Sequence, residues 1–382
     1  MESGEIRKAT LGEIALVFLK LGTIAFGGPA AHLAMMQEEF VRRKKWISQA
    51  DFLDRLAAAN LIPGPSSTEV AIFIGHLKRG WRGLIVAGCS FIIPAALIAM
   101  AIAWAYVRYG ALPQAQSVLG AIKPVVVAII IQALGKLGRS GIKTISLAVI
   151  AALAVGLNLI GVSPVWVLII AGALAAAELG MRTRLLGVGT VATPKMVGGA
   201  LAAVVVAGAW PVGLGRLFLS FLKIGSIVFG SGYVLLAFLQ TEFVQHLHWL
   251  TEQQLLDAVA VGQFTPGPLS ATATFIGYVV AGWKGAVVAT VGIFLPGFVL
   301  VALSGPVIPR LRRSAVFSAA LDGVIAGSLA LMAIVTWQLG RASIVNWTTL
   351  ALFVASLIGL IRFRINSGWL IAGGAVVGLF VR

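Results

Sequence analysis

The sequence is poor in charged residues. Only 11% of its 382 residues are Asp, Glu, Lys or Arg, and 59% are hydrophobic. A soluble domain carries about 25% charged residues, and one compact core cannot bury so much apolar surface. The composition therefore excludes a soluble globular protein.

Cysteine is almost absent as well. Cys89 is the single cysteine and lies within an apolar run, so no disulfide can form within the chain. The four histidines show no metal-ligand spacing, and no CxxC pair occurs. We therefore expect neither a metal site nor a cofactor.

Signatures of nucleotide binding and catalysis are also missing. The glycine-rich stretches Gly27–Gly28 and Gly230–Gly232 follow no predicted strand and carry no P-loop lysine. Transport driven by ATP is therefore not expected. No catalytic dyad is found either, so we expect no catalytic residues and a protein that is not an enzyme.

Long apolar runs, in contrast, are abundant. They are about 15 to 25 residues long, which is the length of a helix that spans a bilayer. Runs such as Val125–Ile131 and Ile145–Val155 do not alternate in polarity, which excludes a β-barrel. Because backbone in lipid must satisfy its own hydrogen bonds, the runs predict an all-α polytopic membrane protein surrounded by lipid.

The net charge of +16 comes mostly from short loops between these runs. In a soluble protein such a charge suggests nucleic acid as a partner. In a membrane protein, lysine and arginine in short loops set the topology. We therefore expect no nucleic-acid partner.

The chain repeats itself. The stretch Phe18–Gly27 (FLKLGTIAFG) recurs 203 residues later as Phe221–Gly230 (FLKIGSIVFG). Two further motifs recur in the same order: Pro63–Pro65 (PGP) as Pro266–Pro268, and Gly80–Gly83 (GWRG) as Gly282–Gly285 (GWKG). This duplication predicts an N-terminal repeat at 1–190, a linking transmembrane segment at 191–213 and a C-terminal repeat at 214–382.

Each repeat is predicted to open with two broken or re-entrant helical hairpins, followed by about four transmembrane helices. Glycine and proline end helices, and the hairpin arms are too short to span a bilayer comfortably. The hairpins are expected at 11–41, 48–78, 214–245 and 251–281. The spans are expected at 82–107, 113–135, 144–160, 164–181, 284–303, 315–338, 344–361 and 367–381, with the link at 196–213.

The charges predict that the second repeat is inverted. The loop at Arg42–Lys45 is wholly basic, whereas the equivalent Gln245–His248 has no lysine or arginine. Basic loops remain cytoplasmic, so we expect a cytoplasmic N-terminus and a periplasmic C-terminus in the inner membrane. Inverted repeats with broken helices are typical of secondary transporters.

The two Pro-Gly-Pro breaks are the sharpest candidate for a binding site. A new helix is predicted after each break, with Ser66 and Ser67 or Ser270 at its start. A helix N-terminus offers unpaired N–H groups and a partial positive charge, which form an anion site within a membrane. Two proline kinks with capping serines are the alternative.

Several charged residues lie within the apolar runs. Lys20 and Lys223 occupy equivalent positions; we expect them to attract an anion, because an unpaired cation in a membrane is costly. Snorkelling to the interface is the alternative. For Lys123 we predict an ion pair with Asp322.

Acidic residues are scarce, and Glu69 directly follows the first break, where the second repeat has Thr272. It is a candidate proton carrier, or else its charge stabilises the helix N-terminus. The candidates for coupling are Glu69, Lys123, Asp322, Glu39 and Glu242.

The stretch Phe18–Pro29, the Asn60–Pro65 block (NLIPGP) and Gly80–Gly83 together resemble the chromate ion transporter family in its long, two-domain form. The resemblance covers essentially the whole chain. It implies efflux of chromate, a tetrahedral dianion, with sulfate as a close analogue, and resistance to chromate. The second half departs from the first by carrying Gln263 where the first has Asn60, and Ser231 where the first has Gly28.

With this resemblance, the candidate substrate-binding residues are Lys20, Lys223, Asn60, Pro63, Gly64, Pro65, Ser66, Ser67, Gln263, Pro266, Gly267, Pro268, Ser270, Gly27, Gly28, Gly230 and Ser231. A carrier of sulfate or another oxyanion and an anion channel are the alternative functions. The sequence leaves open whether the chain forms a homodimer.

Overall fold

The computed structural model describes residues 9–26, 28–185, 213–229, 234–304, 314–363 and 365–380. Over these residues the fold is helical and contains no strand. Five helices are long and apolar enough to cross a membrane: Ser66–Tyr109, Pro113–Gly141, Pro164–Arg182, Leu269–Leu303 and Ala315–Ser343. The prediction of an all-α membrane protein is confirmed.

The first half contains short helices before its long ones. Thr10 and Glu13 form a capping box that starts the first helix, and Ser48 caps α3. The elements are α1 (Leu11–Ile24), α2 (Gly28–Gln37), the π-helix η1 (Glu38–Arg43), α3 (Gln49–Ala59), α4 (Ser66–Tyr109), α5 (Pro113–Gly141), α6 (Ile145–Leu159) and α7 (Pro164–Leu185).

The second half follows the same order. Its elements are α8 (Leu214–Ile227), α9 (Leu235–Leu239), the π-helix η2 (Gln240–His246), α10 (Glu252–Phe264), the 3₁₀ turn η3 (Leu269–Ala271), α11 (Thr272–Leu303), α13 (Ala315–Ser343), α14 (Trp347–Ile361) and α15 (Ser367–Phe380). A capping box between Thr251 and Gln254 starts α10, at the place where Ser48 starts α3.

Unusual backbone conformations recur in both halves. The chain turns sharply inside α4 at Gly80 (φ 55°) and inside α11 at Gly282 (φ 62°). In each case two helical arms fold back on each other, and a side chain at Gly75 or Gly277 would collide with the backbone of the other arm. The sharp turns explain why a glycine stands before each Trp of the repeated motif.

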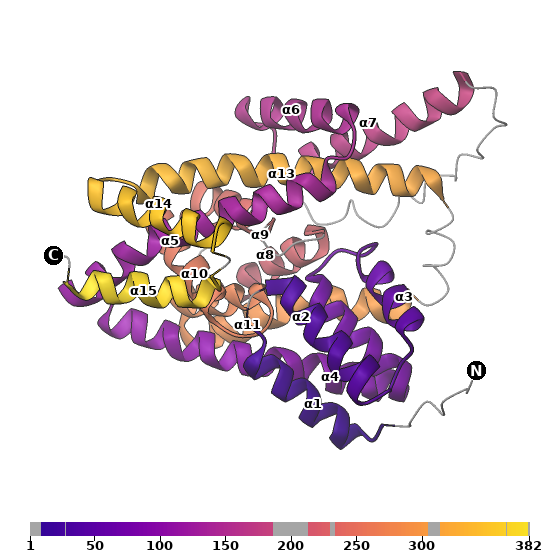
Figure 1. Ribbon diagram of the computed structural model, residues 1–382, viewed down its shortest axis with the longest axis horizontal. Coiled ribbons are helices and arrows are strands. Elements are labelled where there is room, and N and C mark those ends of the chain that lie inside the picture. The colour runs from indigo at the N-terminus through magenta and orange to yellow at the C-terminus, as the bar shows by residue number, and fades with distance from the viewer. Residues whose placement is uncertain are drawn as a thin grey trace.

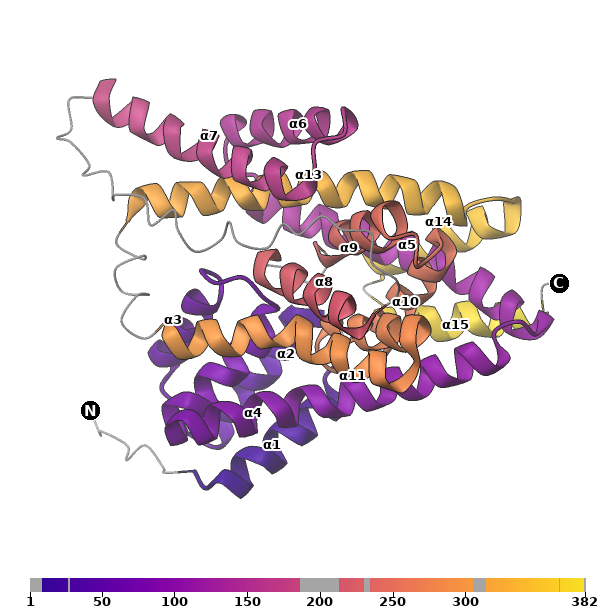
Figure 2. The same ribbon diagram turned by 180° about the vertical axis from the view of Figure 1, so that it is seen from behind.

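The helices are arranged in three groups (Figures 1 and 2). Both views place α6, α7 and α13 along one side of the molecule and α1 and α4 along the opposite side, with α8, α9 and α10 between them. Helix α11 packs against α8 of its own half and against α4 of the first half. The helices that contain the breaks therefore meet where the two halves are in contact.

Three expected spans are shorter than predicted. The segments α6, α14 and α15 have 15, 15 and 14 residues, about 22 Å of helix against a bilayer core of about 30 Å.

The predicted link at 196–213 lies almost wholly outside the described residues. The domain boundaries, the inversion of the second repeat and the orientation of the termini therefore stay predictions.

Candidate functional site

The two Pro-Gly-Pro breaks each bind the other half of the chain. The Gly64 N–H donates to the carbonyl of Val228 at 2.6 Å, and the Gly267 N–H donates to the carbonyl of Ala25 at 2.9 Å. Ala25 directly follows α1, and Val228 directly follows α8. Each Pro-Gly-Pro segment thus bonds to the backbone that follows the first helix of the opposite half, so the four breaks in the chain, two in each half, are joined in pairs across the halves.

The backbone at both central glycines requires glycine. Gly64 has φ 138° and Gly267 has φ 90°, a region that L-residues with a side chain rarely adopt. The hydrogen bonds also use the N–H groups of these two glycines. These two N–H groups are therefore already bonded across the halves and are not free donors.

The residues after the first break form a buried, hydroxyl-rich helix start. Ser66, Ser67 and Thr68 are at most 5% exposed, and α4 begins at Ser66. The N–H groups of Thr68 and Glu69 bond back to the carbonyl of Pro65. The predicted helix start is therefore present beside the first break.

The second break differs from the first. Ser270 is also buried, at 4% exposure, but it lies in the three-residue 3₁₀ turn η3 rather than in the first turn of an α-helix. Helix α11 starts afterwards at Thr272, whose hydroxyl donates to the carbonyl of Leu269 at 2.8 Å. A helix therefore starts after the second break as well, but its first turn is a 3₁₀ turn.

His32 connects the end of α1 with the start of α4, both in the first half, which the sequence did not indicate. Its Nε2 lies 3.0 Å from the carbonyl oxygen of Ala25, and its Nδ1 lies 3.3 Å from Ser67 Oγ. A carbonyl only accepts, so Nε2 carries the hydrogen and donates to Ala25. The second half has Leu235 at the equivalent position, so the repeat pattern gave no sign of this contact.

Glu69 is buried beside the first break. Its exposure is 0%, and neither carboxylate oxygen has a hydrogen-bond partner among the described residues. A Cβ at Gly64 would overlap Glu69 Oε1, and a Cβ at Gly297 of α11 would lie 3.7 Å from the same atom. The carboxyl group therefore lies between the first Pro-Gly-Pro segment and the second half.

The two equivalent lysines have different surroundings. Lys223 Nζ lies 2.9 Å from Glu242 Oε2, and Ser220 Oγ donates to Glu242 Oε1 at 3.0 Å. Lys20 is exposed and has no such carboxylate within the described part of the chain; Glu39, which matches Glu242, lies 3.9 Å from Arg43 instead. The expectation of two unpaired lysines is wrong for Lys223.

Lys123 forms an ion pair that differs from the predicted one. Its Nζ lies 3.2 Å from Asp257 Oδ1, and the Tyr106 hydroxyl donates to Asp257 Oδ2 at 2.9 Å. Asp322 pairs with Lys143 at 3.4 Å. The predicted Lys123–Asp322 pair is therefore wrong, because α10 of the second half packs against α5 and brings Asp257 to the lysine.

The remaining candidate residues lie around the breaks or outside the described residues. Asn60 ends α3 and is exposed, and Gln263 is half-buried near the end of α10. The prolines Pro63, Pro65, Pro266 and Pro268 flank the two central glycines, and Gly28 begins α2. Gly27, Gly230 and Ser231 lie outside the described residues.

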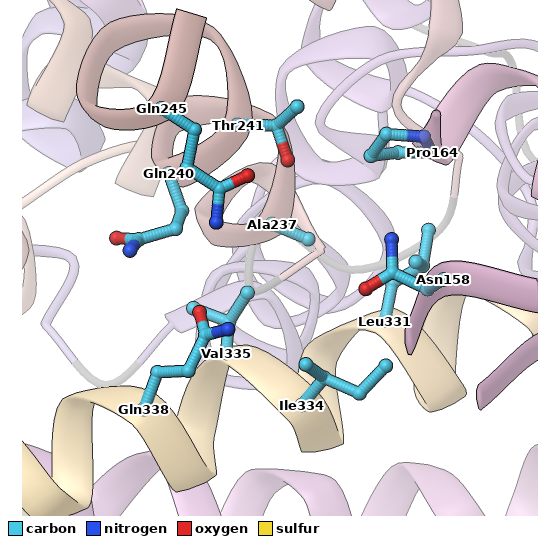
Figure 3. A pocket seen from close by; sticks show the side chains of 10 residues that line it. All are labelled: Asn158, Pro164, Ala237, Gln240, Thr241, Gln245, Leu331, Ile334, Val335 and Gln338. Carbon is cyan, nitrogen blue, oxygen red and sulfur yellow. The ribbon is translucent and has the colours of Figure 1, made fainter. Parts of the chain in front are cut away.

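A separate polar cavity lies away from the breaks (Figure 3). Its volume is about 20 Å³, room for about one water molecule. The buried Gln240 donates from Nε2 to Glu252 at 3.3 Å. The lining contains amides and a hydroxyl but no charged side chain: Asn158, Pro164, Ala237, Gln240, Thr241, Gln245, Leu331, Ile334, Val335 and Gln338. This cavity lacks the charge that an anion site needs.

Metal binding finds no support in the described part of the chain. No group of three or more His, Cys, Asp or Glu side chains is placed to hold an ion there.

Comparison with known proteins gives one consistent result. A family model described as "Chromate transporter" matches residues 12–177 and again residues 215–379. The chromate transport protein of Cupriavidus metallidurans is 34% identical over 97% of this chain and 93% of the relative. The probable chromate transport protein of Synechococcus elongatus is 32% identical over 92% of this chain and 89% of the relative. The chromate transport protein of Pseudomonas aeruginosa is 32% identical over 85% of this chain and 80% of the relative. No solved structure matches the chain.

Proposed function

Because the chain belongs to the chromate transporter family, we propose that it exports chromate across the inner membrane as a secondary transporter and so confers resistance to chromate. Its long apolar helices make it a multi-pass membrane protein. In this proposal the protein catalyses no covalent chemistry, and its substrate is the tetrahedral dianion.

The anion binds, in this proposal, where the breaks are joined across the halves. The observation that carries it is the reciprocal bonding of Gly64 and Gly267 to the opposite halves. This bonding brings the start of α4 and its buried hydroxyls to the contact between the halves, and a helix start attracts negative charge. A tetrahedral oxyanion has acceptors in several directions, so it suits donors that converge from both halves.

The membrane potential supplies the driving force. With the cell interior negative, an anion moves outward with a gain of about 2.3 kcal/mol per charge per 100 mV. A dianion gains twice as much as a monoanion. Export therefore needs no ATP, in agreement with the missing nucleotide-binding motif.

Two other functions share part of this support. A carrier of sulfate or another oxyanion would use the same site, because these ions share the charge and shape of chromate. An anion channel would need a continuous water-filled pore, and the binding groups here are buried between the halves instead.

Transport by purified protein in liposomes distinguishes these functions. Vesicles loaded with unlabelled chromate are diluted into labelled chromate, and the label is followed. A carrier accumulates the label transiently by counterflow, whereas a channel does not. Sulfate loaded in place of chromate tests the anion preference. Counterflow with sulfate and none with chromate would reject chromate as the substrate, and flux without counterflow would indicate a channel.

A further inference from the structure

Glu69 lies close to the proposed anion site and lacks any compensating contact. It follows the first break within the first turn of α4, and both carboxylate oxygens are fully buried without a partner in the described chain. The carboxyl group of Glu69 lies beside Gly64 of the first break and Gly297 of α11. The missing side chain at Gly64 makes the room that the carboxyl group occupies.

The charged and titratable groups on the helices around Glu69 do not neutralise it. Within the described residues, none of them forms an ion pair with Glu69. His32 on α2 is bonded to Ala25 and Ser67 instead. The other such groups on Glu69's own helix and on the helices packed against it are Glu13 and Lys20 on α1, Asp51, Asp54 and Arg55 on α3, His76, Lys78, Arg79, Arg82, Cys89, Tyr106, Arg108 and Tyr109 on α4, Glu252 and Asp257 on α10, and Tyr278 and Lys284 on α11.

A dianion bound at the breaks makes an ionised Glu69 still less favourable. An ionised carboxylate buried without partners is costly, and a second negative charge nearby adds repulsion that the low-dielectric interior screens poorly. Binding a proton removes both costs. No cluster of metal ligands in the described chain offers a cation instead.

We propose that Glu69 takes up a proton when the anion binds at the breaks, so that one proton accompanies each dianion and the membrane potential acts on one net negative charge; this inference rests on the proposed function. The proton comes from water and forms the O–H bond of the carboxylic acid, and it leaves again when the anion is released. By linkage, the proton strengthens anion binding by the same factor by which the anion strengthens proton binding. The second half has Thr272 at this position, so the chain has a single site of this kind.

Anion affinity measured against pH tests the proposal. Purified full-length protein is titrated with chromate and, separately, with sulfate, which stays a dianion throughout the neutral and alkaline range. For the unmodified protein we expect the sulfate affinity to fall by about ten-fold per pH unit on the alkaline side, as one linked proton requires. Glu69→Gln imitates the protonated acid, so its affinity should not change with pH and should equal the highest affinity of the unmodified protein.

Two further variants make the result decisive. Glu178→Gln removes a half-buried carboxylate that already pairs with Arg182 on its own helix, and it should keep the pH dependence. His32→Gln removes the other titratable group beside the breaks and should keep the pH dependence too. An unchanged slope in Glu69→Gln would overturn the proposal, and a slope lost only in His32→Gln would assign the proton to His32.

Proton uptake provides an independent measurement. In weakly buffered solution, adding sulfate should raise the pH with the unmodified protein and leave it unchanged with Glu69→Gln. Uptake that persists in Glu69→Gln would overturn the proposal. If the unmodified protein binds neither chromate nor sulfate, the proposed function itself fails; if it binds them but Glu69→Gln behaves identically, only the proton site fails.

Discussion

The two halves of the chain share their backbone breaks but place different side chains beside them. Gly64 and Gly267 both have positive φ and both donate to the opposite half. Beside the first break lie the buried Glu69 and His32, where the second half has Thr272 and Leu235. The backbone conformation and the contact with the opposite half require glycine at this position in each half. Nothing in that geometry requires the neighbouring side chains to match.

The lysines show the same contrast. Lys223 is held by Glu242 in the second half, and Lys20 is exposed in the first. The matched positions therefore do not imply matched roles. The two halves share their backbone breaks and differ in the side chains beside them, and the following experiments test that difference.

Alanine at either central glycine should have the largest effect. A side chain at these φ values costs about 1–3 kcal/mol, and contacts add to it. At Gly267 the new Cβ would lie 2.8 Å from Ala95 Cβ and 3.2 Å from the Gly22 carbonyl oxygen, which cannot easily move. We expect Gly267→Ala to lower thermal stability strongly and to abolish transport.

At Gly64 the new Cβ would meet the flexible Glu69 side chain instead. Gly64→Ala should therefore abolish chromate counterflow with a smaller loss of thermal stability than Gly267→Ala. Gly135→Ala is the control, because a Cβ there meets nothing within 4 Å. Equal stability and transport in all three variants would contradict the requirement for glycine at the breaks.

The buried ion pair between the halves should have the next largest effect. Lys123→Ala leaves Asp257, which is 5% exposed, without its cation, and breaking a buried pair costs about 3–5 kcal/mol. Lys143→Ala breaks the exposed pair with Asp322 and should cost about 0–1 kcal/mol. Thermal unfolding in detergent measures both, and similar losses in the two variants would contradict the different burial of the pairs.

The equivalent lysines allow a direct comparison of the halves. We expect Lys20→Ala and Lys223→Ala each to abolish chromate resistance while the protein still reaches the membrane, because each removes a cation near the breaks. Only Lys223→Ala should lose stability, by about 1–3 kcal/mol, since it leaves the hydrogen-bonded Glu242 unpaired. Resistance assays with immunoblots of membranes test both, and normal resistance in both variants would assign the lysines to the membrane interface.

Removal of the hydroxyls beside the breaks should weaken anion binding. A hydrogen bond to a charged group contributes roughly 1.5–3 kcal/mol, so Ser67→Ala and Ser270→Ala should each lower chromate affinity about ten-fold or more, and the double variant should abolish binding. Ser67→Ala should have the larger effect because it also removes the contact with His32.

Ser140→Ala is the matched control for the two serines. This hydroxyl is exposed and bonds only to the preceding turn of its own helix. Chromate affinity that is unchanged in Ser67→Ala/Ser270→Ala, with intact folding, would place the anion elsewhere.

Single cysteines test the inversion with the smallest disturbance. In a Cys89→Ala background, a cysteine at Ser48 or Thr251 costs only an N-cap, about 1 kcal/mol. We expect a membrane-impermeant reagent to label the two positions from opposite sides. Labelling from the same side would refute the inverted repeat.

The sequence by itself determined the helical membrane fold and the position of the breaks. Apolar runs of bilayer length allow only helices, and Pro-Gly-Pro cannot continue one. The repeated Pro-Gly-Pro at Pro63–Pro65 and Pro266–Pro268 marked where helices end. These features are local, so the order of residues along the chain was enough to find them.

Only the tertiary structure decided which residues meet. Asp257 rather than Asp322 reaches Lys123, and His32 reaches Ser67, because the packing of the helices brings them together. The repeat pattern compares each residue with its own equivalent, and Lys123 and His32 have Ile325 and Leu235 at the equivalent positions of the other half. Contacts that break the symmetry of a duplicated chain depend on distance in space, which the spacing along the sequence does not give.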